Sequence, residues 1–267
     1  MSRIDDTFAR LRDKGRKGLV GYLTAGDPDF DTSLADLRAA IESGLDVLEL
    51  GVPFSDATAD GPTIQEASQR ALAGGMTVAR ALELVRALRR DHDLPIILFG
   101  YVNPFFRYGY QRLAAEAAEA GVDGVLVVDM PHEEADELCE HLARHDLACI
   151  PLIAPTTPVE RASAILRVSR GFVYYIMVKG VTGARSELAV DVDEHVQRLR
   201  ECTELPVAVG FGISSGEQAR QVAQSAQAVV VGSALVRAAR ASRAALEALV
   251  ADLHNALGAG EGADPRT

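Results

Sequence analysis

Two acidic residues, Glu49 and Asp60, stand where a carboxylate could transfer a proton or stabilise a charge. Glu49 interrupts an otherwise apolar run, VLEL at 47–50, which is typical of a buried strand. A carboxylate inside such a strand loses hydration, which raises its pKa and suits it to general acid–base catalysis. The alternative is a structural carboxylate held by neighbouring N–H groups. Asp60 lies in the following loop, 52–62, where an aspartate can equally form a turn or cap a helix.

Two glycine-rich segments, GFGISS at 210–215 and VGSA at 231–234, could bind a phosphate group. Glycine lets an anion approach free backbone N–H groups closely, especially where a helix begins. Both segments could instead be ordinary tight turns. A third segment, GVTGAR at 180–185, could form a mobile lid whose Gly183 also reaches the phosphate.

Other reactive residue types are placed less favourably. The six histidines include no pair with metal-ligand spacing at a predicted strand end, so we expect no metal. A nucleophile elbow and a P-loop are both absent. No lysine lies inside a predicted strand, which argues against a Schiff-base mechanism. Lys179, at the end of the sixth predicted strand, keeps such a mechanism as an alternative. Cys139, Cys149 and Cys202 match no metal motif, and we expect reduced thiols.

Eight short apolar segments, each followed by a helical pattern, must position these residues. The predicted strands are 18–24, 46–52, 95–101, 123–129, 148–154, 172–178, 206–212 and 227–233. Their nearly continuous apolar runs are typical of parallel strands buried on both faces. Strands that alternate with helices in this way favour a single (β/α)8 TIM barrel over an open doubly wound sheet, which is the alternative. In such a barrel the active site lies at the carboxyl ends of the strands, and the loops after the last two strands often bind phosphate.

The length of 267 residues suits one barrel with small additions. An apolar stripe formed by Ile4, Phe8 and Leu11 predicts an extra helix before the first strand, which could plug the bottom of the barrel. The stretch 62–92 is long enough for two helices, one more than the repeat needs. We expect a catalytic domain at 1–258 and a flexible tail at 259–267.

The charge balance limits the partners. A formal net charge of −11 argues against nucleic acid and anionic membranes, and it means that a phosphate site must rely on local N–H groups. No apolar run approaches the roughly 20 residues that a membrane helix needs, and the first residues show no apolar signal region. We therefore expect a cytoplasmic protein.

The segments around the two carboxylates, LELGVPFSD at 48–56 and ADGPTIQ at 59–65, resemble the signature of the tryptophan synthase alpha subunit family. Further motifs of the family occur in the same order: YLTAGDP at 22–28, GVTG at 180–183, FGIS at 211–214 and VGSA at 231–234. The resemblance therefore runs from the first predicted strand to the last helix.

The resemblance implies retro-aldol cleavage of indole-3-glycerol phosphate to indole and glyceraldehyde 3-phosphate. It assigns proton transfer to Glu49, and to Asp60 the stabilisation of positive charge at the indole nitrogen. It implies no cofactor in this chain, and a partner beta subunit that carries pyridoxal phosphate in a heterotetramer. The expected substrate-binding residues are Tyr22, Tyr101, Tyr175, Thr182, Gly183, Gly212, Gly232 and Ser233.

The chain departs from the family pattern at Ala57-Thr58, where proline and leucine are usual. Losing the proline is expected to loosen the loop, and threonine removes apolar area from a surface that faces the beta subunit. A second departure is 176–179 (IMVK), where the family commonly has a serine. Two other functions stay open: another phosphate-binding barrel enzyme, such as indole-glycerol phosphate synthase with its catalytic lysine, and a non-catalytic barrel that activates a partner. The intact pair Glu49 and Asp60 weighs against the latter.

Overall fold

A computed structural model describes residues 2–176, 185–210 and 212–258, with the backbone alone described for 185–193. The expected substrate-binding residues Thr182 and Gly183 lie outside these ranges, as do Lys179 and the expected tail at 259–267. The proposed extent of the catalytic domain, 1–258, therefore remains a prediction.

The described strands form one parallel sheet in the order β5-β4-β3-β2-β1-β9-β8-β7-β6. Its two edge strands, β5 (Ala148–Cys149) and β6 (Leu152–Ile153), belong to the same stretch of chain. Between them, the Ile150 N–H donates to Val125 of β4 (2.9 Å), and the Pro151 carbonyl accepts from Tyr174 of β7 (2.9 Å). The chain thus passes directly from one edge to the other, and the sheet closes into the predicted barrel. Proline, which has no N–H, lies at the break in the predicted fifth strand.

Every other predicted strand contains one observed strand. These are β1 (Gly18–Thr24), β2 (Val47–Gly51), β3 (Ile96–Gly100), β4 (Gly124–Val127), β7 (Val173–Ile176), β8 (Val207–Gly210) and β9 (Ala228–Val231). Their residues are mostly buried, as expected for strands enclosed between an interior core and an outer layer of helices.

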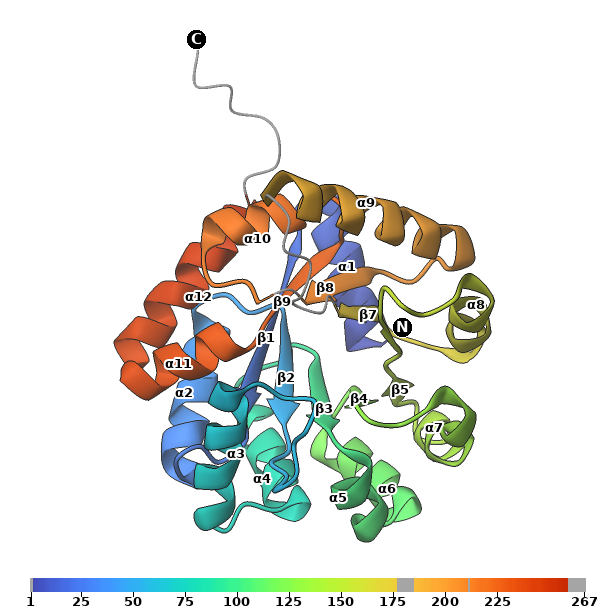
Figure 1. Ribbon diagram of the computed structural model, residues 1–267. Coiled ribbons are helices and arrows are strands. Elements are labelled where there is room, and N and C mark those ends of the chain that lie inside the picture. The colour runs from blue at the N-terminus through green and yellow to red at the C-terminus, as the bar shows by residue number, and fades with distance from the viewer. Residues whose placement is uncertain (1, 177–184, 211, 259–267) are drawn as a thin grey trace.

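Helices surround the strands in sequence order, as the ring in Figure 1 shows. They are α2 (Phe30–Glu42), α3 (Pro62–Ala73), α4 (Val78–Leu88), α5 (Val102–Tyr108), α6 (Tyr110–Ala120), α7 (Asp136–Ala143), α8 (Val159–Val168), α9 (Arg185–Cys202), α10 (Gly216–Val222), α11 (Ser233–Ala241) and α12 (Arg243–Gly258). A short 3-10 helix, η1 (His132–Glu134), precedes α7. The pair α3 and α4 confirms the extra helix after the second strand. None of the helices within the described ranges is both long and apolar enough to cross a membrane.

The predicted N-terminal helix, α1 (Arg3–Asp13), closes the bottom of the barrel. Its N-cap Ser2 forms a capping box with Asp5. The Phe8 ring packs 5.7 Å from the ring of Phe172, immediately before β7. Because these contacts lie at the amino ends of the strands, the opposite end stays open for a site.

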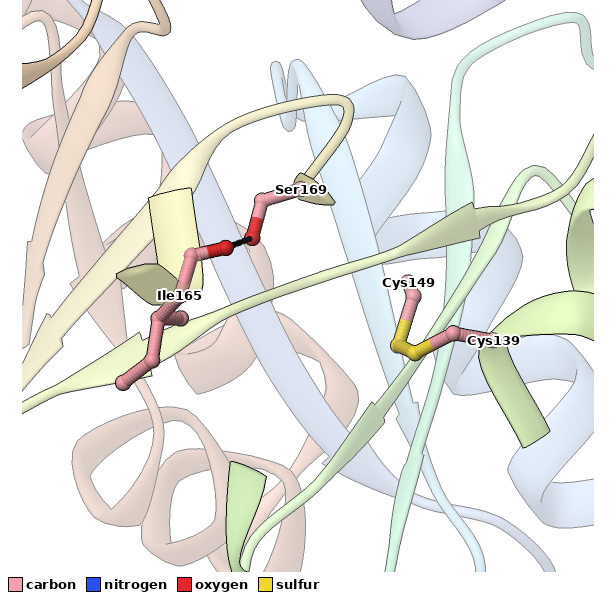
Figure 2. The surroundings of a disulfide bond; sticks show 4 residues. All are labelled: Cys139, Cys149, Ile165 and Ser169. Carbon is pink, nitrogen blue, oxygen red and sulfur yellow. Dashed lines mark hydrogen bonds between the residues drawn. A yellow bond between two sulfur atoms is a disulfide. The ribbon is translucent and has the colours of Figure 1, made fainter. Parts of the chain in front are cut away.

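The cysteines differ from the expectation of reduced thiols. Cys139 of α7 and Cys149 of β5 form a disulfide, with their Cα atoms 5.6 Å apart (Figure 2). The chain reverses between α7 and β5, and this reversal brings two cysteines only 10 residues apart into contact. Among the described residues only Cys202 is a free thiol, so the expectation of reduced thiols holds for this cysteine alone. The disulfide lines an outer cavity of about 230 Å³ between the barrel wall and α7 and α8, together with Ile165 and Ser169.

Candidate active site

The register of the barrel points Glu49 into the interior. Glu49 aligns with Tyr22 of β1 on one side and with Ile97 of β3 on the other. Aligned residues of neighbouring strands point to the same face, and Tyr22 lines a cavity at the barrel mouth. Glu49 therefore lies on the inner wall below that cavity.

The Glu49 side chain is fully buried, and its surroundings favour the protonated form. Within the described residues neither of its carboxylate oxygens has a hydrogen-bond partner. Burial raises the pKa of Glu49 to about 8. A structural carboxylate would be satisfied by neighbouring N–H groups, and none in the described structure reaches it. An uncompensated carboxyl group with a pKa close to neutrality is suited to give and take protons.

Asp60 reaches the same mouth from the loop after β2 and lines the cavity. The Tyr101 hydroxyl donates a hydrogen bond to Asp60 Oδ2 at 3.0 Å and accepts one from the Ala59 N–H at 3.1 Å. Burial raises the pKa of Asp60, and the hydrogen bond from Tyr101 opposes that rise. Tyr101 thus orients the carboxylate and favours its charged form, although it does not itself line the cavity.

The loop that carries Asp60 is tied down despite its departure at Ala57-Thr58. Gln65 of α3 donates from Nε2 to the carbonyls of Ala57 (3.1 Å) and Asp60 (2.9 Å). The Asp60 N–H donates to the Ala57 carbonyl at 3.1 Å. The Ala57 side chain is buried, whereas Thr58 is exposed. These bonds supply restraint that a proline would otherwise provide, so the expected loosening is limited.

The cavity at the mouth has a volume of about 510 Å³. Aromatic and aliphatic side chains from the inner faces of the strands form its walls: Tyr22, Phe99, Val128, Leu152, Tyr174, Ile176 and Val230. Backbone-rich segments at Gly61–Ile64, Gly212–Ile213 and Gly232–Ala234 form its rim. The cavity therefore combines a flat apolar interior, suited to an aromatic ring, with a polar edge.

Adjacent tyrosines on β7 point in opposite directions, and the inner one is Tyr174. Tyr174 lines the cavity, and burial together with the charges of Glu49 and Asp60 raises its pKa well above the usual value. The Tyr175 ring stacks on His195 of α9, with centroids 6.2 Å apart, inside the outer apolar layer. The structure therefore contradicts the expectation that Tyr175 lines the substrate cavity, and it places Tyr174 there instead. The reason is the two-residue period of a strand, which puts neighbours on opposite faces.

The described residues that were expected to bind phosphate lie around the same cavity. Gly212, Gly232 and Ser233 all line the cavity. Ser233 is the first residue of α11, and Gly232 is its N-cap. The first N–H groups of a helix have no partner within the helix, so those of α11 are available to an anion in the cavity. Gly212 has a φ of 48°, a conformation that favours glycine.

Two further cavity residues, Phe99 and Arg237, were missed in the sequence. Phe99 lies in a run of apolar residues, so only the register reveals that it faces Tyr22, with ring centroids 5.1 Å apart. Arg237 lies one helical turn beyond Ser233, and its i, i+4 spacing from that residue could have signalled it. Among the described residues, no group of three histidine, cysteine or acidic side chains is placed to hold a metal ion.

The chain is similar to known proteins of one family. A sequence model of the family "Tryptophan synthase alpha chain" matches residues 8–261. The tryptophan synthase alpha chain of Laribacter hongkongensis is 50% identical over 264 residues, covering 97% of this chain and 100% of that protein. The one from Gluconobacter oxydans is 52% identical over 238 residues, covering 89% and 88%.

Solved structures show the same likeness. A tryptophan synthase structure from Mycobacterium tuberculosis superposes with a TM-score of 0.91 at 40% identity, covering 97% of this chain and 99% of that one. The tryptophan synthase alpha chain of Legionella pneumophila superposes with a TM-score of 0.88 at 39% identity, covering 96% and 97%.

Proposed function

This chain belongs to the tryptophan synthase alpha chain family, and we propose that Glu49 and Asp60 carry out its chemistry at the barrel mouth. The family membership makes the chain the alpha subunit, a lyase of tryptophan biosynthesis that cleaves indole-3-glycerol phosphate to indole and glyceraldehyde 3-phosphate. The observation that carries the proposal for the site is the buried carboxyl of Glu49, unpartnered within the described residues.

In the first step Glu49 acts as an acid. Its raised pKa keeps it largely protonated at neutral pH, and its proton passes to C3 of the indole ring. The ring then carries positive charge that is shared with the indole nitrogen. The Asp60 carboxylate, oriented by Tyr101, stabilises this charge from the cavity wall.

In the second step the Glu49 carboxylate acts as a base. It removes the proton of the hydroxyl group next to the ring, and the O–H electrons form the carbonyl of glyceraldehyde 3-phosphate. The carbon–carbon bond breaks, and its electron pair restores the neutral aromatic indole. Glu49 is protonated again, so one turnover leaves the enzyme unchanged.

The substrate fits the cavity in one orientation. The indole lies between the aromatic walls that include Tyr22, Phe99 and Tyr174, and the phosphate lies against Gly212, Gly232 and Ser233. This orientation places the bond to be broken near the inner wall, where Glu49 lies. These steps need no cofactor, and we expect pyridoxal phosphate to be bound by the beta subunit.

The decisive experiment is an assay of indole release from indole-3-glycerol phosphate, with and without a beta subunit. We expect indole under both conditions. If neither produces indole, the assignment fails, and a lysine-dependent or non-catalytic barrel becomes the better interpretation.

Members of this family pair with a beta subunit, and we infer that the partner binds over the barrel mouth. The surface there includes Thr58, in the Asp60 loop, and Phe106, on α5 after β3. The Phe106 side chain is 65% exposed, which is unusual for a large apolar residue. A heterotetramer of two alpha and two beta subunits and a cytoplasmic location remain predictions.

A matched pair of substitutions separates the two tyrosines of β7. We expect Tyr174→Phe to reduce kcat/KM for indole release by roughly 10-fold, because it removes a hydroxyl group from the cavity beside both carboxylates. Tyr175→Phe should leave kcat/KM within about two-fold, because that ring packs on α9. Steady-state kinetics of both variants provide the test, and a larger loss in Tyr175→Phe would contradict the placement.

A further inference from the structure

The rim of the mouth cavity carries a positive charge at Arg237. Of the described residues that line the cavity, Arg237 is the only cation and Asp60 the only carboxylate. Arg237 lies on α11, four residues after Ser233, so the two side chains project from the same side of the helix.

The guanidinium group of Arg237 lies at the cavity rim, and no described carboxylate pairs with it. Its Nη1 donates to the Thr63 hydroxyl of α3 at 3.4 Å, a long contact between the two helices at the rim. In the described part of the chain no carboxylate forms a salt bridge with it. The side chain is exposed, so it can turn toward a ligand at little cost.

Electrostatics at the cavity otherwise oppose an anion. The chain has a net charge of −11, and Asp60 shares the cavity that a phosphate would enter. The start of α11 offers the equivalent of only about half a positive charge. A phosphate monoester carries close to two negative charges at neutral pH. A full positive charge at the rim is therefore a large part of the local attraction.

We propose that Arg237 binds the phosphate group of the substrate and determines the preference of this enzyme for phosphorylated three-carbon chains. A guanidinium can donate two parallel hydrogen bonds to phosphate oxygens, which adds directed bonds to those from the backbone of Gly232 and Ser233. The inference rests on the proposed function, because it takes the same substrate and the same orientation in the cavity.

The test compares Arg237→Gln with Arg240→Gln, the same charge change on the same helix outside the cavity lining. For Arg237→Gln we expect the KM for indole-3-glycerol phosphate to rise roughly 10- to 100-fold, with kcat within about three-fold, since charge-assisted bonds act in both ground and transition states. Arg240→Gln should match the wild type. Arg237→Lys should recover part of the affinity through its charge alone.

The reverse reaction separates phosphate recognition from a structural effect. Indole is supplied together with either glyceraldehyde 3-phosphate or unphosphorylated glyceraldehyde, and Arg237→Gln should weaken only the reaction of the phosphorylated aldehyde. Equal loss with both aldehydes, or an unchanged KM for the phosphorylated one, would overturn the proposal. Thermal unfolding of each variant verifies that the barrel is intact.

Binding of inorganic phosphate, measured by calorimetry, provides a readout that does not depend on catalysis. We expect it to weaken at least 10-fold in Arg237→Gln and to stay unchanged in Arg240→Gln. If the wild type released no indole but still bound phosphate through Arg237, the proposed function would fail while this site remained. If indole release were normal and phosphate affinity equal in all variants, the role of Arg237 alone would be rejected.

Discussion

Replacing Glu49 with glutamine is expected to lower kcat for indole release by at least about 100-fold, the usual contribution of a positioned acid or base. Glutamine has nearly the same shape but can neither give a proton to C3 of the indole nor accept one from the substrate hydroxyl. The carboxyl group is buried, and no described side chain forms a hydrogen bond with it. No described neighbour is therefore placed to transfer the proton in its stead. The loss should therefore appear in kcat rather than in KM.

The matched control is Glu83→Gln, which makes the same chemical change at an exposed position of α4 and should keep full activity. Steady-state kinetics and the thermal unfolding midpoint of both variants complete the measurement. An intact Glu49→Gln variant that retains more than about a tenth of the wild-type kcat would contradict the acid–base role.

The pH profile of the wild type follows from the same carboxyl group. Burial raises the pKa of Glu49 to about 8, and the first step uses the protonated form. We therefore expect the Glu49 limb of kcat/KM to be level below that pH and to fall as the pH rises through it. In Glu49→Gln the residual activity should lack this limb. An activity that instead increased through pH 8 would show that the ionised form begins the reaction.

Replacing Asp60 with asparagine is expected to lower kcat roughly 100- to 1,000-fold, as the loss of a preorganised stabilising group does in other enzymes. An amide keeps the size of the side chain but removes the charge that opposes the positive indole nitrogen. Asp60 lines the cavity, so the lost interaction is with the substrate itself. Indole release in the absence of a beta subunit is the measurement, because it excludes effects on the partner.

Asp56→Asn is the control for this loop, since Asp56 is exposed and accepts a hydrogen bond from Ser55 at 2.6 Å. Its activity without the beta subunit should match the wild type. Tyr101→Phe provides a further check. The hydrogen bond from Tyr101 lowers the pKa of Asp60, so its removal should shift the acid limb of kcat/KM to higher pH. If Asp60→Asn kept wild-type kcat, the charge-stabilising role would be rejected.

Local patterns in the sequence were enough to predict the barrel. Apolar runs of the right length, separated by helical periodicity, depend only on neighbouring residues, and each predicted strand contains observed strand residues. The same is true of α1, whose apolar stripe and Ser2 cap are local features. The break at Pro151 moved a boundary without changing the topology.

The two carboxylates were also within reach of the sequence, because Glu49 contradicts its apolar strand and both residues lie in a specific signature. The environments of these two carboxylates could not be predicted from the sequence. A partner-free carboxyl, or one oriented by Tyr101, depends on side chains that come from strands far apart in the chain. Similarly, only the reversal of the chain between α7 and β5 revealed that Cys139 and Cys149 meet.

The sequence by itself therefore determined the order of strands and helices and the family, and it selected Glu49 and Asp60 as the candidate acidic pair. The tertiary structure alone decided which of two adjacent tyrosines, Tyr174 or Tyr175, faces the substrate cavity. Both lie in a strand that is apolar on both faces, so its composition cannot mark the inner one. The choice depends on how β7 aligns with its neighbours, and that register exists only once the barrel has closed.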